Sequence, residues 1–100
     1  MSGRSAPIHP GEVLLKEFLE PHGVTPYKLA KRIGVPVGRV TAILAGKRAV
    51  TADTAVRLGR FFGTSAELWL GLQSAWELEK MGDLREEIES GIEPLDKVRS

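Results

Sequence analysis

Apolar residues recur along this chain at spacings of three and four, which is the period of one face of an α-helix. No segment alternates apolar and polar residues over the length of a strand. Glycines and prolines divide the chain into helix-sized pieces, chiefly at 21–23, Gly34, Gly46, Gly63 and Gly82. The pattern therefore predicts an all-α protein made of short helices.

The first helix is predicted over about 10–20. Pro10 suits the first helical position, where its missing N–H would be unpaired in any case, and His9 is the expected cap. Its buried stripe is expected to contain Leu14, Leu15, Phe18 and Leu19. Because proline cannot continue a helix and glycine favours its end, Pro21 and Gly23 are expected to stop it.

The following helices are expected at about 26–33, 36–45, 52–62 and 64–81, with a short helical, fraying extension over 83–100. Thr25 and Thr51 are the expected caps of the second and fourth helices. The fifth helix opens on Thr64 and Glu67, which have the spacing of a capping box. Five helices thus account for the chain up to Met81.

Residues 26–45 have the most informative spacing, because it fits two short helices that cross at a tight turn. Ala30, at the fifth position of this window, is small enough to let the second helix approach the first. Gly34, at the ninth, permits a sharp, left-handed turn. Apolar residues occupy the five positions that fill the crossing, namely Leu29, Ile33, Val35, Val40 and Ile43. This predicts a helix-turn-helix; the alternative is a generic helical hairpin.

Charge is distributed unevenly, although the formal net charge is only +1. Residues 1–63 contain ten Lys or Arg against four Asp or Glu, a balance of +6, whereas residues 64–100 contain four against nine, a balance of −5. Between 25 and 48 there are six basic residues and no acid. Unless this segregation is accidental, it indicates one surface for a polyanion and another surface for a different partner.

Four features, HPGEVL, LAKRIGVP, GKRAVTADTAVRLGRFFGTSAELWL and a Leu-Gln pair followed by an aromatic residue, resemble antitoxins of the HigA/VapI type. These belong to the Xre/Cro-like helix-turn-helix family, and the resemblance covers residues 8–79. The acidic, amphipathic residues that follow predict a partly helical extension over 82–100, and the resemblance implies a five-helix, lambda-repressor-like DNA-binding domain over 8–81. It also implies a homodimer that binds double-stranded operator DNA, represses its own operon and neutralises a HigB (RelE-like) mRNA-cleaving toxin.

The sequence departs from the family pattern where the helix-turn-helix begins. The family usually has a Gln there, whose amide holds a DNA phosphate, and this chain has Pro26. The hydroxyl of Thr25 and the backbone N–H of Tyr27 are the groups that can replace it. Both are therefore included in the expected DNA-binding surface.

The expected recognition helix offers few groups that can read a base edge. With Val40, Ile43 and Leu44 inward, its outer face consists of Gly38, Ala42 and Ala45, flanked by Arg39 and Thr41. Small residues allow close approach and contact with a thymine methyl group. Direct readout then rests on Arg39, which can pair with guanine, and on Thr41. The alternatives are indirect readout of DNA shape and weakened DNA binding.

Basic residues beside this face are expected to contact phosphates. Lys47 and Arg48 follow the recognition helix, where a loop meets the DNA backbone in this family, and Lys28 lies on the preceding helix. No acid is expected close enough to cancel these charges or that of Arg39. The alternative is that these side chains, like Lys31, are simply solvated.

The fifth helix is predicted to contribute a dimer interface. Trp69 fits a core position, and Trp76 lies one heptad further on, beyond the point where a five-helix core closes. We therefore expect Leu72, Ala75 and Trp76 to lie near a two-fold axis, with toxin contact or ordinary packing as the alternatives. The acidic extension, including Glu86, is expected to help hold a basic toxin or to be a solvated helix face.

Residues with catalytic or metal-binding spacing are not apparent in the sequence. There is no cysteine, which excludes disulfides and thiol catalysis, and the two histidines do not form a metal-binding motif. No phosphate-binding Gly-rich loop is found. We therefore expect a protein without enzymatic activity, metal or cofactor. It is also expected to be cytoplasmic and without membrane contact, since no apolar run approaches the roughly 20 residues of a membrane span.

Three functions remain open on the sequence alone. The first is an antitoxin that also binds its operator, the second a stand-alone Xre-type regulator, and the third a protein-interaction module whose helix-turn-helix is only a scaffold. The resemblance favours the first. The scarcity of base-reading side chains keeps the third open.

Overall fold

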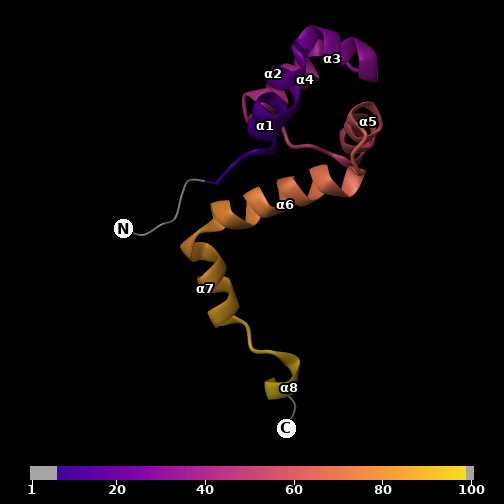
Figure 1. The fold of residues 1–100 in the computed structure, drawn as a ribbon. Helices are drawn as coiled ribbons and strands as arrows, with labels where there is room; N and C mark the ends of the chain where they lie inside the picture. The colour runs from indigo at the N-terminus through magenta and orange to yellow at the C-terminus, as the bar shows by residue number, and fades with distance from the viewer. Residues whose placement is uncertain (1–6, 99–100) are drawn as a thin grey trace.

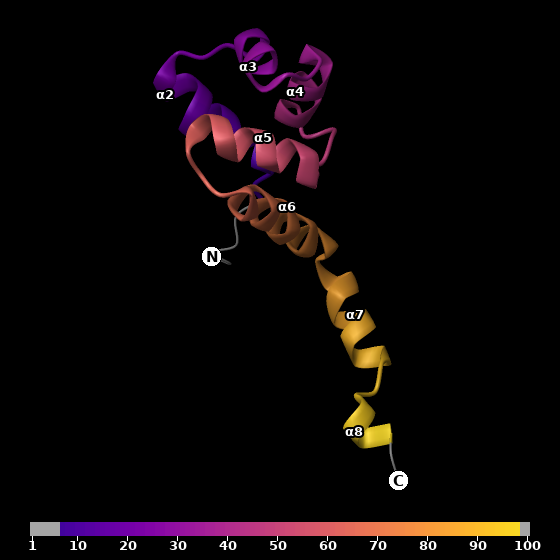
Figure 2. The same ribbon diagram turned by 90° about the vertical axis from the view of Figure 1, so that its right-hand side faces the viewer.

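The computed structural model describes residues 7–98 of the chain, and every regular element in that range is a helix. The segments are α1 (Pro10–Val13), η1 (Leu14–Leu19), α2 (Glu20–His22), α3 (Pro26–Ile33), α4 (Val37–Leu44), α5 (Ala52–Phe62), α6 (Ala66–Met81), α7 (Asp83–Gly91) and α8 (Leu95–Val98). Helices α1 to α6 form one body, and α7 and α8 continue from α6 away from it (Figure 1, Figure 2). The predicted all-α class is confirmed.

The first three segments form one continuous helix with a wide turn in its middle. The segment η1 is π-helical, and the N–H of Glu20 bonds to the carbonyl of Leu15, five residues back. Leu14 and Leu19, also five residues apart, are both buried. The predicted stop at Pro21 is wrong, because the helix continues to His22 and ends at Gly23, whose φ is 64°. The wider turn before Pro21 gives its ring room that an α-helical turn would not.

The predicted helix-turn-helix is present as α3 and α4. The hydroxyl of Thr25 caps α3 by accepting from the N–H of Lys28 at 3.1 Å. Gly34 ends α3 with φ 77°, and the N–H of Val35 bonds back to the carbonyl of Ala30. Ala30 is buried between the two helices, as its position predicted.

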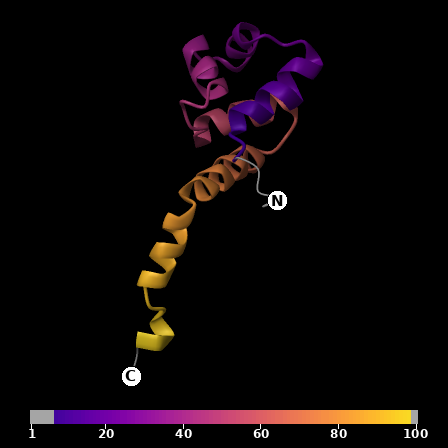
Figure 3. The ribbon, with the colours of Figure 1, turned by 90° about the vertical axis from the view of Figure 1, so that its left-hand side faces the viewer.

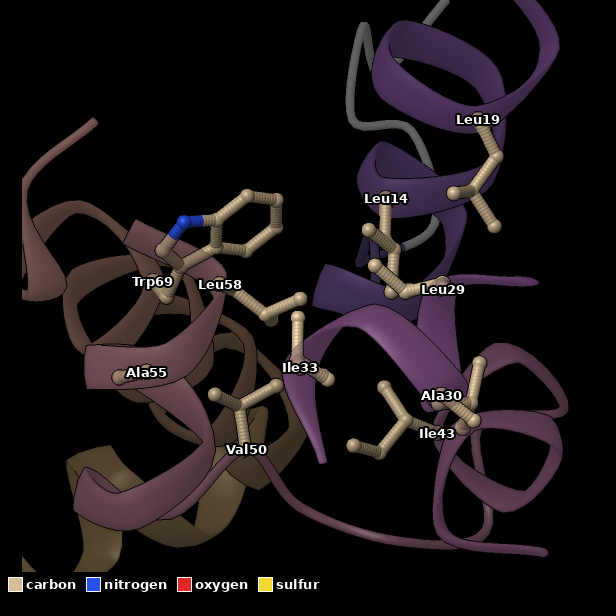
Figure 4. Close-up of a cluster of buried hydrophobic side chains, with 11 residues drawn as sticks. Leu14, Leu19, Leu29, Ala30, Ile33, Ile43, Val50, Ala55, Leu58 and Trp69 are labelled. Carbon is tan, nitrogen blue, oxygen red and sulfur yellow. The ribbon is translucent and has the colours of Figure 1, made fainter. Parts of the chain in front are cut away.

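Side chains from most of the helices meet in one core (Figure 4). Its buried apolar residues are Leu14, Leu19, Leu29, Ala30, Ile33, Val40, Ile43, Val50, Ala55, Leu58 and Trp69. Trp69 is fully buried, as expected, and packs near Phe18 and Phe62 with ring centroids 5.0 and 6.4 Å away. Burial of this one indole therefore joins the first helix to the ends of α5 and α6.

The start of α6 differs from the predicted capping box by one residue. The cap is Ser65, whose Oγ accepts from the N–H of Leu68 at 3.0 Å. Thr64 has a different role, because its hydroxyl oxygen accepts from the indole Nε1 of Trp69 at 2.9 Å. The buried indole N–H needs an acceptor, and Thr64 supplies it.

The segment from α7 onward has no buried side chain among its described residues. Leu84 and Ile88 form an exposed apolar row on α7, while Glu86, Glu87 and Glu89 are also exposed. Figure 3 shows this part of the chain leading away from the helical body. Within residues 7–98, no helix combines the length and the apolar character needed to cross a lipid bilayer.

Candidate nucleic-acid interface

The outward surface of α4 is formed by Val37, Gly38, Thr41 and Ala45, which are all exposed. We call these four residues the reading face. Ala42, which was expected on this outer face with Gly38 and Ala45, is half-buried. Val40 and Ile43 are fully buried, whereas Leu44 is only half-buried. The solvent-exposed side of α4 is therefore centred nearer to Thr41 than the sequence predicted. The hydroxyl of Thr41 donates back to the carbonyl of Gly38 at 3.3 Å.

Val37 was not among the predicted site residues, although 43% of its surface is exposed. It begins α4 and shares one row of that helix with Thr41 and Ala45, each four residues further on. That spacing is the signal by which the sequence could have identified it. The reading face is therefore apolar apart from the Thr41 hydroxyl and the backbone.

Arg39 does not project freely from α4. Its Nη1 donates to Oδ1 of Asp53 at 2.9 Å, and one quarter of its side chain is exposed. The same oxygen accepts from Nε of Arg57 at 2.8 Å, and Nη1 of Arg57 donates to the carbonyl of Ile33 at 2.7 Å. The expectation that no acid lies near the basic residues is therefore wrong.

Asp53 was missed because it is 14 residues away from Arg39 along the chain, in the first turn of α5. The hydrogen bonds from Arg57 and then from Arg39 hold the pKa of the Asp53 carboxyl below its ordinary value. The carboxylate consequently stays charged at neutral pH. This junction connects the end of α3, the start of α4 and the start of α5.

The remaining predicted contact residues lie around the helix-turn-helix. Lys28, Lys47 and Arg48 are exposed, the last two in the loop between α4 and α5. Tyr27 is 64% exposed, and the ammonium group of Lys31 lies 5.8 Å from its ring centroid. Together with the reading face, these residues make a basic, largely unobstructed surface suited to a polyanion.

The loop that carries Lys47 and Arg48 is held at its end by a buried amide side chain of α6, that of Gln73. Oε1 of Gln73 accepts from the backbone N–H of Val50 at 2.9 Å, and Nε2 of Gln73 donates to Glu77 at 2.9 Å. Gln73 and Val50 are both buried. An inward-facing residue of α6 thus holds the end of the candidate phosphate-binding loop.

The residues expected at a dimer interface lie on two sides of α6. Leu72 is half-buried and Ala75 exposed, and Leu68 and Leu78, also exposed, extend the same apolar row. Trp76 is half-buried against the body: its ring centroid lies 4.7 Å from that of His9, and the ammonium of Lys80 lies 4.8 Å from it. Trp76 shares the inward side of α6 with Trp69, one heptad earlier.

Metal binding finds no support in the described part of the chain. Residues 7–98 contain no group of three or more His, Asp or Glu side chains placed to hold an ion. His9 instead caps α1, with its Nδ1 accepting from the N–H of Gly11 at 2.9 Å. What the described surface offers is binding through basic and apolar groups.

Comparison with known proteins adds three findings. A helix-turn-helix family model matches residues 15–69. Virulence-associated protein I of Dichelobacter nodosus is 46% identical over 72 residues, covering 72% of this chain and 67% of that protein. Antitoxin HigA-1 of Vibrio cholerae is 35% identical over 89 residues, covering 89% of this chain and 84% of that protein.

Solved structures give the same picture at the level of the fold. The antitoxin HigA of Pseudomonas aeruginosa, solved with the higBA promoter, superimposes with a TM-score of 0.82 at 43% sequence identity. The match covers 89% of this chain and 98% of that one. The fold of that antitoxin is therefore shared along nearly the whole of both chains.

Proposed function

The chain belongs to the helix-turn-helix family, in its HigA antitoxin branch, and from that premise we propose that it is an antitoxin that represses its own operon. It binds double-stranded operator DNA as a homodimer and neutralises a toxin of the HigB (RelE-like), mRNA-cleaving kind. The observation that carries this proposal is the match to a promoter-bound HigA along nearly the whole of both chains. The protein acts by binding alone, in the cytoplasm, without catalysis, metal or cofactor.

The reading face of α4 recognises bases through apolar contact. Thr41 is its only side chain with a hydrogen-bonding group, and Val37 and Ala45 add methyl groups around it. In the major groove, the C5-methyl group of thymine is the feature that such side chains can distinguish. Gly38 and the half-buried Ala42 lie close to this contact, and their small size lets the helix backbone approach the bases.

Phosphate contacts supply most of the affinity. Lys28, Lys47 and Arg48 are exposed around the reading face, and each phosphate neutralised releases a counterion. At the start of α3 the Thr25 hydroxyl oxygen accepts a hydrogen bond from the backbone N–H of Lys28. The hydroxyl proton of Thr25 can therefore donate to a phosphate oxygen. The backbone N–H of Tyr27 lies in the same first turn, at the positive end of the helix dipole, where it can donate to a phosphate oxygen.

The dimer forms through the apolar row of α6, with Leu72 and Ala75 near the two-fold axis and Trp76 at the edge. Two-fold symmetry places the two recognition helices about one DNA turn apart, roughly 34 Å. Ala75→Glu, at an exposed position, is expected to give a folded protein that sediments as a monomer. A dimer that persists in this variant would exclude this face of α6.

The acidic extension over 82–100 holds the toxin, and the domain over 8–81 holds DNA. RNA-cleaving toxins must bind a polyanion and carry basic surfaces, so the exposed acids of α7 provide a complementary charge. A complex at this segment leaves the helix-turn-helix free for the operator. The two activities are then separable by truncation.

The test is co-expression with the product of the neighbouring gene, followed by gel shifts with promoter DNA. Rescue of growth and a sequence-specific shift are expected together. A specific shift without a toxin partner would favour a stand-alone regulator, and toxin binding without any shift would favour an interaction module. Replacing thymine by uracil in the operator removes the methyl groups and should weaken binding, whereas unchanged affinity would refute apolar readout.

A further inference from the structure

The two arginines that share Asp53 differ in what else holds them. Arg57 is anchored twice, since its Nε donates to Asp53 and its Nη1 donates to the carbonyl of Ile33 at 2.7 Å. Among the described residues, the only hydrogen bond of the Arg39 guanidinium is the one that its Nη1 donates to Asp53, and its buried Nε has no partner. Loss of the Asp53 carboxylate would therefore release Arg39 and leave Arg57 attached to α3.

The position of Arg39 limits what it can offer to DNA. A bidentate contact with guanine or phosphate needs two free N–H groups along one edge of the guanidinium. Burial closes the edge that contains Nε, and Nη1 already donates to a carboxylate. The carboxylate, although it is shared with Arg57, also offsets part of the positive charge that would otherwise draw Arg39 to the DNA backbone.

Asp53 is itself in the right place to act on binding. It is 57% exposed in its side chain and lies in the first turn of α5, next to the start of the recognition helix. An exposed ion pair stabilises a fold by only about 0–1 kcal/mol, so stability alone does not require an acid at this position. An acid beside a DNA-binding helix opposes binding to every sequence alike, because phosphates are the same everywhere.

We propose that Asp53 is a specificity-determining positioning residue, which holds Arg39 away from DNA and so lowers affinity for non-operator sequences. Because Arg39 is held away from DNA, discrimination between sequences is left to the reading face. The ratio of the affinity for the operator to the affinity for other DNA therefore rises. This inference rests on the proposed operator binding. It assigns Asp53 a role in rejection of wrong DNA, and it removes Arg39 from the groups that read a base.

The experiment compares Asp53→Asn with the unchanged protein on operator and scrambled DNA, between 50 and 200 mM salt. Freeing Arg39 adds one phosphate contact per protomer, so the log–log salt slope should steepen by about 2 per dimer. Over that range the loss of affinity becomes about tenfold larger. Affinity for scrambled DNA at the lower salt should rise more than affinity for the operator.

Double variants identify the source of the gain. Arg39→Gln should abolish it in the Asp53→Asn background and change little in the unchanged protein. Arg57→Gln in the same background should retain it. Glu20→Gln removes an exposed negative charge on the first helix and serves as the charge-matched control. Asp53→Ser also removes the carboxylate and serves as a second test of the same loss. Circular dichroism melts establish that each variant is folded.

Two results would overturn the proposal while leaving operator binding intact. One is an unchanged salt slope in both Asp53 variants. The other is a loss of preference at a single base pair when Arg39→Gln is made alone, which would make Arg39 a base reader. Failure of the unchanged protein to distinguish operator from scrambled DNA would instead refute the proposed function, and with it this inference.

Discussion

Replacement of Gln73 by leucine tests how the loop that carries Lys47 and Arg48 is held. The change keeps the approximate size of a buried side chain but removes the acceptor of the Val50 N–H, which then has no partner in the core. An unsatisfied buried donor costs about 1–3 kcal/mol in unfolding free energy. For a domain of this size each kcal/mol corresponds to a fall in Tm of about 4–8 °C. We therefore expect Tm to fall by about 4–24 °C.

The assays are thermal denaturation and hydrogen exchange of the Val50 amide. This amide should be protected in the unchanged protein and exchange rapidly in Gln73→Leu. Glu77→Ala is the control, since it removes only the exposed partner of the Gln73 Nε2 and should cost about 0.5 kcal/mol or less. An equal loss of stability in both variants, or a Val50 amide that stays protected in Gln73→Leu, would refute this account.

Three further changes test other parts of the structure. Gly11→Ala should lower stability by about 1–3 kcal/mol in a denaturant titration, because a Cβ there would overlap the Ile43 carbonyl; Gly38→Ala, with open space around it, should not. Burial and then the charge of Lys80 lower the pKa of His9 in the folded protein. The unfolded chain therefore binds more protons, and stability should fall as the pH drops below about 6.5. His9→Asn, which can still cap α1, should flatten this part of a Tm-against-pH profile; an unaltered profile would assign the effect elsewhere. Truncation after Gly82 should weaken binding of the toxin and spare DNA binding, and unchanged toxin affinity in titration calorimetry would exclude a role for the extension.

The helix-turn-helix could be predicted because its constraints are local. A small residue at Ala30, a left-handed glycine at Gly34 and the apolar positions around them are all found within one window of twenty residues. Each meets a steric demand that few other residues can meet. The boundaries of α3 followed from Thr25 and Pro26 for the same reason.

The site was harder to predict because its side chains meet partners from distant segments. The pairing of Arg39 with Asp53 spans 14 residues, and that of His9 with Trp76 spans two ends of the body. A helical wheel assigns residues to faces, but it does not say which neighbour occupies a face. The heptad spacing of Trp76 from Trp69 is visible in the sequence. The sequence does not show that His9, the cap of α1, packs against the Trp76 ring.

The wide turn at Leu14–Leu19 has a consequence for how this chain can change in length. A π-helical turn holds one residue more than an α-helical turn, so it lets Pro10–Val13 and the part after Leu19 keep separate packing registers within one helix. Removal of a single exposed residue here, such as Lys16, would return the turn to the α-helical form, while the segments on either side keep the faces that they now bury. A chain of this fold that is one residue shorter here can therefore keep the same core, so the turn marks a place where a one-residue change in length is absorbed.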